Sequence, residues 1–266
     1  MSSCDDTADG ELASLDNTDL TDDFLGVSSM LLELESMGFS EIERQGSSTG
    51  AITGRKAGEC VDFSVNMDES GRIFYTYDFG EGCEIDSLAL SGRVVTSFFI
   101  DRERNFEETI SYENFSWHEV SIDGEETITG RYVFEFGEDM LDFDIDYSHD
   151  RQIAVTGCDG TTYGITSNSS VRITRSNKTV SVLDQTIETA NSTYVTSIEA
   201  PLVQDFTCDQ KEINIYTTGV LKTVSGEEEL IIDYGEGTCD NLISVTENGN
   251  TIESEASELV QYDFCD

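Results

Sequence analysis

The chain has 266 residues, of which 37% are hydrophobic, and 55 acidic against 14 basic residues give a net charge of -41. A surface this acidic repels nucleic-acid phosphates and anionic lipid headgroups, so neither is expected as a direct partner. Salt adaptation, divalent-cation binding and simple solubility compete as explanations of the charge; we favour salt adaptation, because the acids are spread along the whole chain.

Residues 1–27 are predicted to form a flexible acidic tether. The stretch 5–24 carries acids and no base, so it cannot bury enough apolar surface to offset its chain entropy. The opening MSSCDD looks like the mature end of a bacterial lipoprotein in which Cys4 carries the lipid; the alternative is an incidental cysteine in a tail. No apolar run approaches the ~20 residues that span a bilayer, so contact with a membrane is expected only through that lipid.

Residues 28–47 are predicted to hold one short helix and a connection. Ser28 or Ser29 would cap the helix and Gly38 would end it, with Leu31 and Leu34 on its apolar face. We expect this helix to dock on the β body; the alternative is a collapsed piece of linker.

From residue 48 onward the pattern has period two, which predicts antiparallel strands. The segments are CVDFSVNM, RIFYTYDF, RVVTSFFI, RYVFEF, LDFDIDY, VRITR, INIYTT, ELIIDY and ISVTEN. The turn signals are Glu69-Ser70-Gly71, Asp123-Gly124, Asp159-Gly160, Ser225-Gly226 and Asn248-Gly249. Asn248-Gly249 is typical of a type I′ hairpin, because both residues tolerate positive φ.

A motif of Asp, an aromatic residue and Gly-Glu-Gly before a Cys occurs twice, in YDFGEGCEID at 77–86 and IDYGEGTCDN at 232–241. We interpret the two copies as equivalent turns of a duplicated β unit, spanning residues 48–156 and 157–266. The predicted fold class is therefore all-β, with antiparallel sheets built from two related disulfide-pinned units. A sandwich-like arrangement and an extended meander are both compatible with the pattern, as are one domain or two.

The seven cysteines include no C-x-x-C pair and the chain has only two histidines, which argues against a zinc site. With Cys4 set aside, six remain, and this even number suits an exported protein with up to three disulfides. Cysteines at both ends of each predicted hairpin indicate two pairs, each worth roughly 3–4 kcal/mol on the chain-entropy model. The predicted pairs are Cys60–Cys83, Cys208–Cys239 and, with the two cysteines left over, Cys158–Cys265.

The segments DFGEGC, SGRVV, PLVQDFTC and DYGEGTCDNLISVTENGNTIE together resemble surface lipoproteins of Bacteroidota. Members carry D-F-G-[DE]-G-C, then D-Y-G-[DE]-G-T-C-D-N and a T-V-T-x-N-G-K hairpin, where this chain has Asn250 in place of the usual Lys. The likeness covers residues 58–100 and 200–253. In that phylum an acidic run after the lipid-bearing cysteine marks export to the cell surface, and Asp5-Asp6 is similar. The resemblance implies an outer-membrane lipoprotein facing the cell surface and supplies no reaction.

The two Gly-Glu-Gly motifs are candidate calcium sites, because calcium takes six to eight oxygen ligands and these loops gather carboxylates. The candidate ligands are Asp78, Glu81, Asp86, Asp233, Glu236 and Asp240. The favoured alternative is structural, with Gly-x-Gly making a tight reversal that the cysteine pins. No cofactor other than calcium is expected. The stretch 141–150 has the odd-numbered acids of an EF-hand loop, but Tyr147 and Ile153 replace its Gly and Glu, so a half-buried strand is predicted there.

Catalytic signals are weak. A Ser-His-Asp triad would need His118 or His149, and no G-x-S-x-G elbow accompanies either. The acids neither support nor exclude a glycosidase. Aromatic side chains in neighbouring strands of the first unit could stack on sugar rings, although core positions are their commoner fate. Phe98 and Phe99 must point to opposite faces of a strand, so both faces should carry aromatics.

The sequence thus favours a non-catalytic, lipid-anchored surface protein for ligand binding, adhesion or envelope structure. Its expected partners are a surface polysaccharide or another envelope protein. The alternatives are an extracellular hydrolase acting on polysaccharide and a calcium-stabilised coat protein with no ligand.

Overall fold

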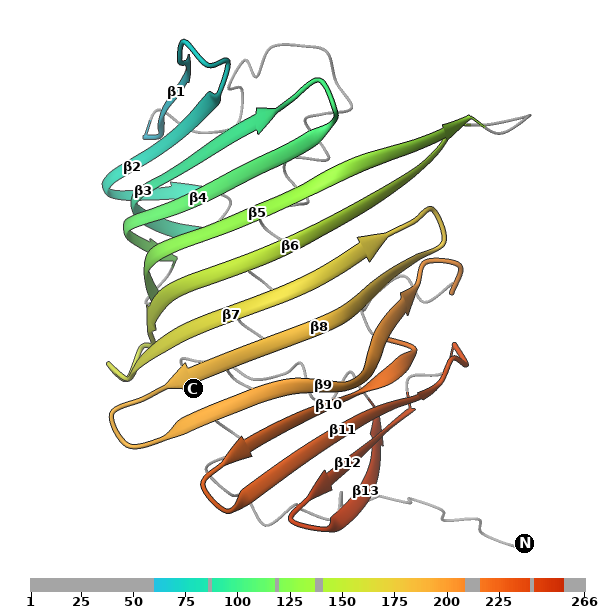
Figure 1. Ribbon diagram of the computed structural model, residues 1–266. Helices are drawn as coiled ribbons and strands as arrows, with labels where there is room; N and C mark the ends of the chain where they lie inside the picture. Colours follow the sequence, from blue (N-terminus) through green and yellow to red (C-terminus); the bar gives the residue numbers. More distant parts are fainter. Residues whose placement is uncertain are drawn as a thin grey trace, which may run out of the picture.

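A computed structural model describes residues 60–85, 88–117, 120–136, 141–208, 216–239 and 242–255. These residues form one antiparallel sheet of 13 strands (Figure 1). The strands are β1 (Asp62–Met67), β2 (Ile73–Ile85), β3 (Leu88–Ile100), β4 (Asn105–Trp117), β5 (Val120–Phe136), β6 (Leu141–Thr156), β7 (Thr162–Ile173), β8 (Asn177–Glu188), β9 (Thr193–Asp205), β10 (Thr218–Ser225), β11 (Glu228–Glu236), β12 (Leu242–Glu247) and β13 (Asn250–Glu255).

The order of the strands in the sheet is their order in the chain, so the fold is an extended meander rather than a sandwich. The boundary between the two predicted units falls between β6 and β7. These strands pair from Ile145 opposite Ile173 to Thr156 opposite Thr162 without a register shift. Both units therefore belong to one continuous sheet. The predicted tether, the predicted helix and Cys4 lie outside the described residues.

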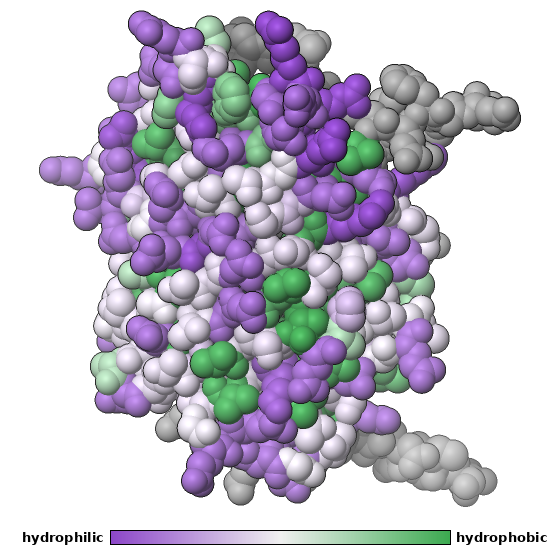
Figure 2. All heavy atoms as spheres, viewed as in Figure 1, coloured by the Kyte–Doolittle hydropathy of each residue, from purple (hydrophilic) through white to green (hydrophobic). Residues whose placement is uncertain are grey.

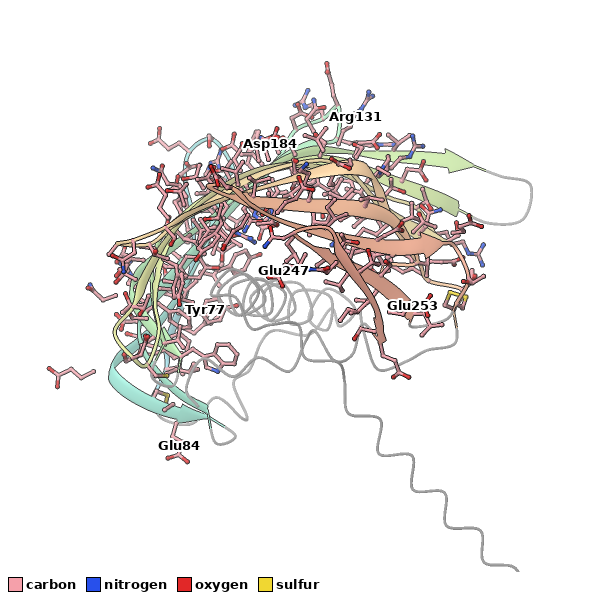
Figure 3. All side chains as sticks on the ribbon, turned by 90° about the horizontal axis from the view of Figure 1, so that it is seen from below. Tyr77, Glu84, Arg131, Asp184, Glu247 and Glu253 are labelled. Atoms are coloured by element: carbon pink, nitrogen blue, oxygen red, sulfur yellow. A yellow bond between two sulfur atoms is a disulfide. The ribbon has the colours of Figure 1, made fainter. Side chains whose placement is uncertain are left out.

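The sheet is strongly curved, and its two faces differ. Seen along the sheet it forms an arch, with Tyr77 and Glu247 on the concave side and Arg131 and Asp184 on the convex side (Figure 3). We call these the inner and the outer face. Because successive side chains in a strand point to opposite faces, the pairing register assigns every other strand residue to one face or the other.

A line of β-bulges crosses β2–β5 and bends the sheet. Gly80, Gly92, Asn114 and Gly124 lie at or next to register shifts in three adjacent strand pairs and have φ values of 59°, 78°, 48° and 124°. At Gly92 a Cβ atom would stand 1.9 Å from the backbone oxygen of Asn114, so only glycine fits there. Bulges of this kind bend a strand and increase its twist.

The predicted turn at Asp123-Gly124 is wrong, because both residues lie inside β5. The Asp123 carboxylate accepts a hydrogen bond of 2.7 Å from the backbone N–H of Asn114 and so stabilises the bulge. The predicted Asn248-Gly249 hairpin is confirmed. Its two residues have φ values of 48° and 85°, and Glu247 pairs with Asn250 across the turn.

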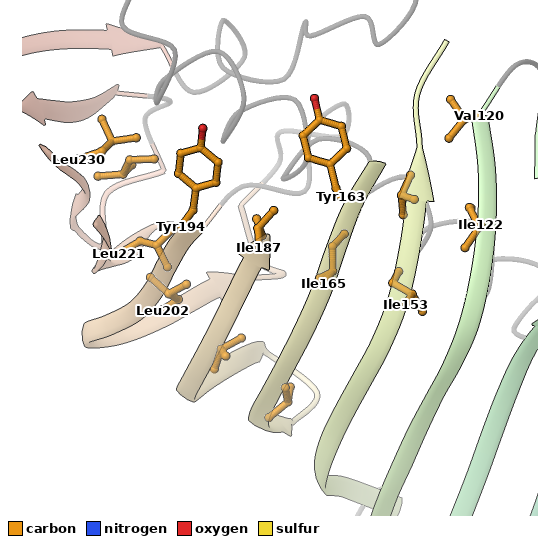
Figure 4. Packing of buried hydrophobic residues seen from close by; sticks show 14 of the residues in the cluster. Val120, Ile122, Ile153, Tyr163, Ile165, Ile187, Tyr194, Leu202, Leu221 and Leu230 are labelled. Carbon is orange, nitrogen blue, oxygen red and sulfur yellow. The ribbon is translucent and has the colours of Figure 1, made fainter. Parts of the chain in front are cut away.

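The core lies on the inner face. Ile153, Ile165, Ile187 and Tyr194 are consecutive cross-strand partners in β6–β9, and all are at most 4% exposed. Figure 4 shows these and neighbouring apolar side chains on the same side of successive strands. Burial of each such side chain contributes roughly 1.5–3 kcal/mol to the stability of the fold, so the row stabilises the middle of the sheet.

Two of the predicted disulfides are present. Cys60 is bonded to Cys83 and Cys208 to Cys239, each with a Cα–Cα distance of 5.5 Å. Cys158 is disulfide-bonded as well, and its predicted partner Cys265 lies outside the described residues. No helix with the length and apolarity to cross a bilayer occurs in the part of the chain that the structure describes.

Candidate functional site

A cluster of charged side chains is buried on the inner face, over β4, β5 and β6. The Glu126 carboxylate is its centre. One oxygen accepts a hydrogen bond of 2.9 Å from the Tyr112 hydroxyl. The other lies 2.7 Å from His149 Nε2 and accepts a 3.0 Å hydrogen bond from Arg151 Nε. Both ionic side chains of the Glu126–Arg151 pair are only 5% exposed.

The register of β5 and β6 produces this cluster. Glu126 lies directly opposite Arg151, and Ile128 lies opposite His149. His149 is therefore the diagonal neighbour of Glu126 on the same face. A buried carboxylate needs such partners, because an isolated buried charge is very costly.

The cluster shifts the pKa values of two carboxyl groups in opposite directions. Burial alone would raise the pKa of Glu126, but the hydrogen bond from His149 and the charge of Arg151 outweigh it and hold that pKa at about 2. Burial, reinforced by the charge of Glu126, raises the pKa of Glu108 in the neighbouring strand. Burial and the same carboxylate raise the pKa of Tyr112 well above its ordinary value. Glu126 is thus a permanent anion, whereas Glu108 binds its proton more readily.

A shallow hollow of about 480 Å³ lies over β5–β8. It is lined by Thr129, Asp146, Tyr147, Ser148, Ser170, Val171, Arg172, Thr179 and Ser181. The register assigns six members of this set to the outer face: Thr129, Asp146, Ser148, Ser170, Arg172 and Thr179. The pairing of β7 with β8 shifts between Ser170 and Val171, because Ser181 is an extra residue in β8, and this bulge lies at the edge of the hollow.

The lining of the hollow is mainly polar, with five Ser or Thr hydroxyls, the Tyr147 ring, Val171 and one guanidinium–carboxylate group. Thr129 and Ser148 share a hydrogen bond of 2.8 Å. The Arg172 guanidinium bonds Asp144 and lies 3.8 Å from Asp146. Around it the outer face, which faces the viewer in Figure 2, is a mixture of hydrophilic and weakly polar residues with small, separate hydrophobic groups.

The candidate calcium ligands have local roles in the Gly-Glu-Gly motifs. Asp78 accepts a 2.9 Å hydrogen bond from the N–H of Gly80, and Asp233 accepts an equal bond from the N–H of Gly235. The two copies therefore share this Asp-to-Gly hydrogen bond. The first copy is not a reversal, however, because it forms a bulge inside β2.

Metal binding at these motifs stays a prediction. Glu81 and Glu236 are exposed, and Asp86 and Asp240 lie outside the described residues. Within those residues no group of three or more His, Cys, Asp or Glu side chains is arranged to hold a metal ion.

The remaining candidates from the sequence are an acidic stretch, a histidine and several aromatic residues. The EF-hand-like stretch 141–150 lies in β6, as predicted, and its Asp150 accepts a hydrogen bond from Asn168. His118 lies outside the described residues. Aromatics occur on both faces, as expected: Phe98 is on the inner face, and Phe99 is on the outer face, 5.7 Å below the Arg72 guanidinium.

Sequence reasoning missed the Glu126 cluster, although a signal was present. In β6, His149 and Arg151 continue the apolar face formed by Ile153 and Val155. A base on an apolar face requires a buried acid opposite it. The hollow has no comparable signal, because its lining comes from four strands, β5–β8, and is brought together only by their pairing.

Comparison with protein-family models, with curated proteins and with solved structures found no match to this chain.

Proposed function

We propose that the protein is a non-catalytic binding protein that presents the outer face of its sheet to a neutral surface polysaccharide. The observation that carries the proposal is the hydroxyl-lined hollow over β5–β8. Sugar rings present neighbouring hydroxyls that both donate and accept hydrogen bonds, and the hydroxyls of Ser and Thr can likewise act as donors or acceptors. The Arg172–Asp146 group adds a charged donor and acceptor at the same place.

The position of the hollow supports binding. Its lining residues lie in paired strands rather than in loops, so the polar groups are held before a ligand arrives and less ordering entropy is lost on binding. A volume of about 480 Å³ lies within the usual range for small-ligand sites. The net charge of -41 favours a neutral over an anionic polymer.

We place this binding protein at the cell surface, held to the outer membrane by a lipid on Cys4 and the acidic tether 1–27. The support is the acidic run after Cys4 and the resemblance to surface lipoproteins of Bacteroidota. The acidic surface is attributed to a saline environment, in which counter-ions screen repulsion between the carboxylates.

Thermal unfolding in the presence of neutral and acidic polysaccharide fragments tests the proposal. A fragment at 100 times its dissociation constant should stabilise the native state by roughly 2.7 kcal/mol. Arg172→Met and Ser170→Leu should abolish that shift, the first by removing the guanidinium and the second by filling the hollow. The matched control is Arg93→Met, which removes an outer-face arginine paired with Glu113. If no neutral fragment raises the melting temperature, or if all three variants respond alike, the proposal is wrong.

One observation favours a second candidate, a polysaccharide hydrolase. Glu108 and Glu126 lie in adjacent strands on the inner face, and their pKa values are shifted in opposite directions, as in pairs of catalytic acid and nucleophile. We rank it second, because both oxygens of Glu126 are already occupied by protein partners. Release of reducing sugar by the native protein and its loss in Glu108→Gln, but not in the exposed control Glu125→Gln, would reverse this order.

A further inference from the structure

At one end of the sheet, the edge strand β1 carries exposed apolar side chains. Among the described strands β1 pairs only with β2, from Asp62 opposite Asp78 to Met67 opposite Ile73 without a bulge. Five of its six residues are exposed. Val65 is 51% and Met67 71% exposed. In an antiparallel edge strand, alternate N–H and C=O groups point away from the sheet and can pair with another strand.

The opposite edge of the sheet is built differently. β13 also has six residues, but it carries Glu253 and Glu255, both exposed. Charged side chains are a common device that keeps an edge strand from pairing with other chains. The only charged residue of β1 is Asp62, at its beginning. Among the described strands, one edge of the sheet thus carries exposed charges and the other carries exposed apolar side chains.

We propose that the edge of β1 binds an extended segment of another protein as an additional strand. Val65 and Met67 lie on the same face of β1, together with Phe63, whose ring is 4.9 Å from that of Tyr77. An added strand would place an apolar side chain at every second position against this row. Backbone hydrogen bonds would supply affinity and the apolar row would supply register.

The charge of the molecule indicates the chemistry of the partner. Asp62 lies at one end of the edge, and Asp68 and Glu69 follow it at the other. A second copy of the chain would bring another net charge of -41, and its own open edge would place Asp62 against the same acids. The segment that fits has apolar residues alternating with Lys or Arg, so that its basic side chains lie on the face of Asp62.

A synthetic peptide of alternating Val and Lys, with blocked ends and a fluorescent label, tests the inference by fluorescence anisotropy. Its matched control has the same sequence and charge but carries N-methyl groups on alternate backbone amides, so it cannot complete a strand pairing. We expect the plain peptide to bind about tenfold more tightly than the methylated one. Equal affinities would mean that only charge attraction holds the peptide, and the inference would be overturned.

Substitutions locate the binding edge. The double variant Val65→Thr with Met67→Thr removes the apolar row at exposed positions, without adding charge or lowering strand propensity. It should weaken binding of the plain peptide about tenfold, because two apolar cross-strand pairs are lost. Ile252→Thr makes the same chemical change on β13 and should leave the affinity unaltered.

Hydrogen exchange gives an independent readout. Bound peptide should slow exchange of the β1 amides, residues 62–67, and leave those of β13 unaffected. Protection confined to β13, or none at either edge, would contradict the proposed site even if the peptide bound. Because the hollow lies over β5–β8, loss of this interaction would not alter polysaccharide binding, and the two proposals can fail separately.

Discussion

Replacing Glu126 by Gln should remove the buried charge while keeping the shape of the side chain. The pKa of this carboxyl falls from an ordinary 4.5 to about 2 in the native state. Each pKa unit corresponds to 1.36 kcal/mol, so the ionised group contributes about 3 kcal/mol to the free energy of unfolding at neutral pH. Removal of a buried ion-pair partner costs a similar amount, about 3–5 kcal/mol, because the Arg151 charge would lose its carboxylate.

The effect should depend on pH in a defined direction. A carboxyl group whose pKa is lowered on folding stabilises the native state above its unfolded pKa, and this stabilisation disappears as the pH falls through the folded pKa. The difference in stability between the native protein and Glu126→Gln should therefore shrink as the pH falls from about 4.5 towards 2. Urea unfolding at constant ionic strength, followed by the fluorescence of the single tryptophan, measures it.

The matched control is Glu125→Gln. Glu125 is the preceding residue and lies exposed on the outer face, where its carboxylate accepts a 3.2 Å hydrogen bond from the Ser111 hydroxyl. Its replacement changes the net charge equally and should alter stability by no more than about 0.5 kcal/mol. The reasoning is refuted if the two variants are equally stable at neutral pH, or if their difference does not change down to about pH 2.

Three further predictions concern stability. Gly92→Ala should destabilise the sheet severely, because its Cβ would lie 1.9 Å from a backbone oxygen. Gly160→Ala is the control: Gly160 also has positive φ but no atom within 4 Å of the added Cβ, so this change should cost only the backbone strain of about 1–2 kcal/mol. Comparison of the urea midpoints of the two variants tests the prediction. Thr223→Val should cost about 1–3 kcal/mol, because it leaves the buried Thr196 hydroxyl without its 2.9 Å partner, and a double valine variant should recover most of that loss in the same assay. Ile165→Ala removes a side chain that is 1% exposed and should lower the free energy of unfolding by about 2–5 kcal/mol. The control is Val182→Ala, at an exposed position. If Ile165→Ala lowered the melting temperature less than Val182→Ala, the assignment of the inner face as the core would be wrong.

The fold class could be predicted because its signals are local. Period-two alternation and Asn248-Gly249 act over a few residues, and each cysteine pair flanks a single hairpin. The prediction of a turn at Asp123-Gly124 is wrong because the feature that explains this pair is not local. Its glycine meets the demands of a bulge, where the neighbouring strand approaches closely, and a bulge needs the same positive φ as a turn. Local sequence alone cannot distinguish the two.

The candidate sites were harder, because they depend on register. Glu126 and Arg151 are 25 residues apart, and only the pairing of β5 with β6 brings them together. A shift of one residue in either strand would have moved one of them to the outer face. The hollow draws its lining from four strands, β5–β8, so it too depends on their register.

The meander has a consequence for how the molecule comes apart. Each strand is held by the two strands next to it in the chain, so the sheet behaves as a linear array whose ends are its weakest points. Cys60–Cys83 closes the first hairpin, and Cys208–Cys239 spans the return from β9 to β11 near the other end. These covalent links hold β1 to β2 and β9 to β11, so a reducing environment should weaken the sheet at these strands.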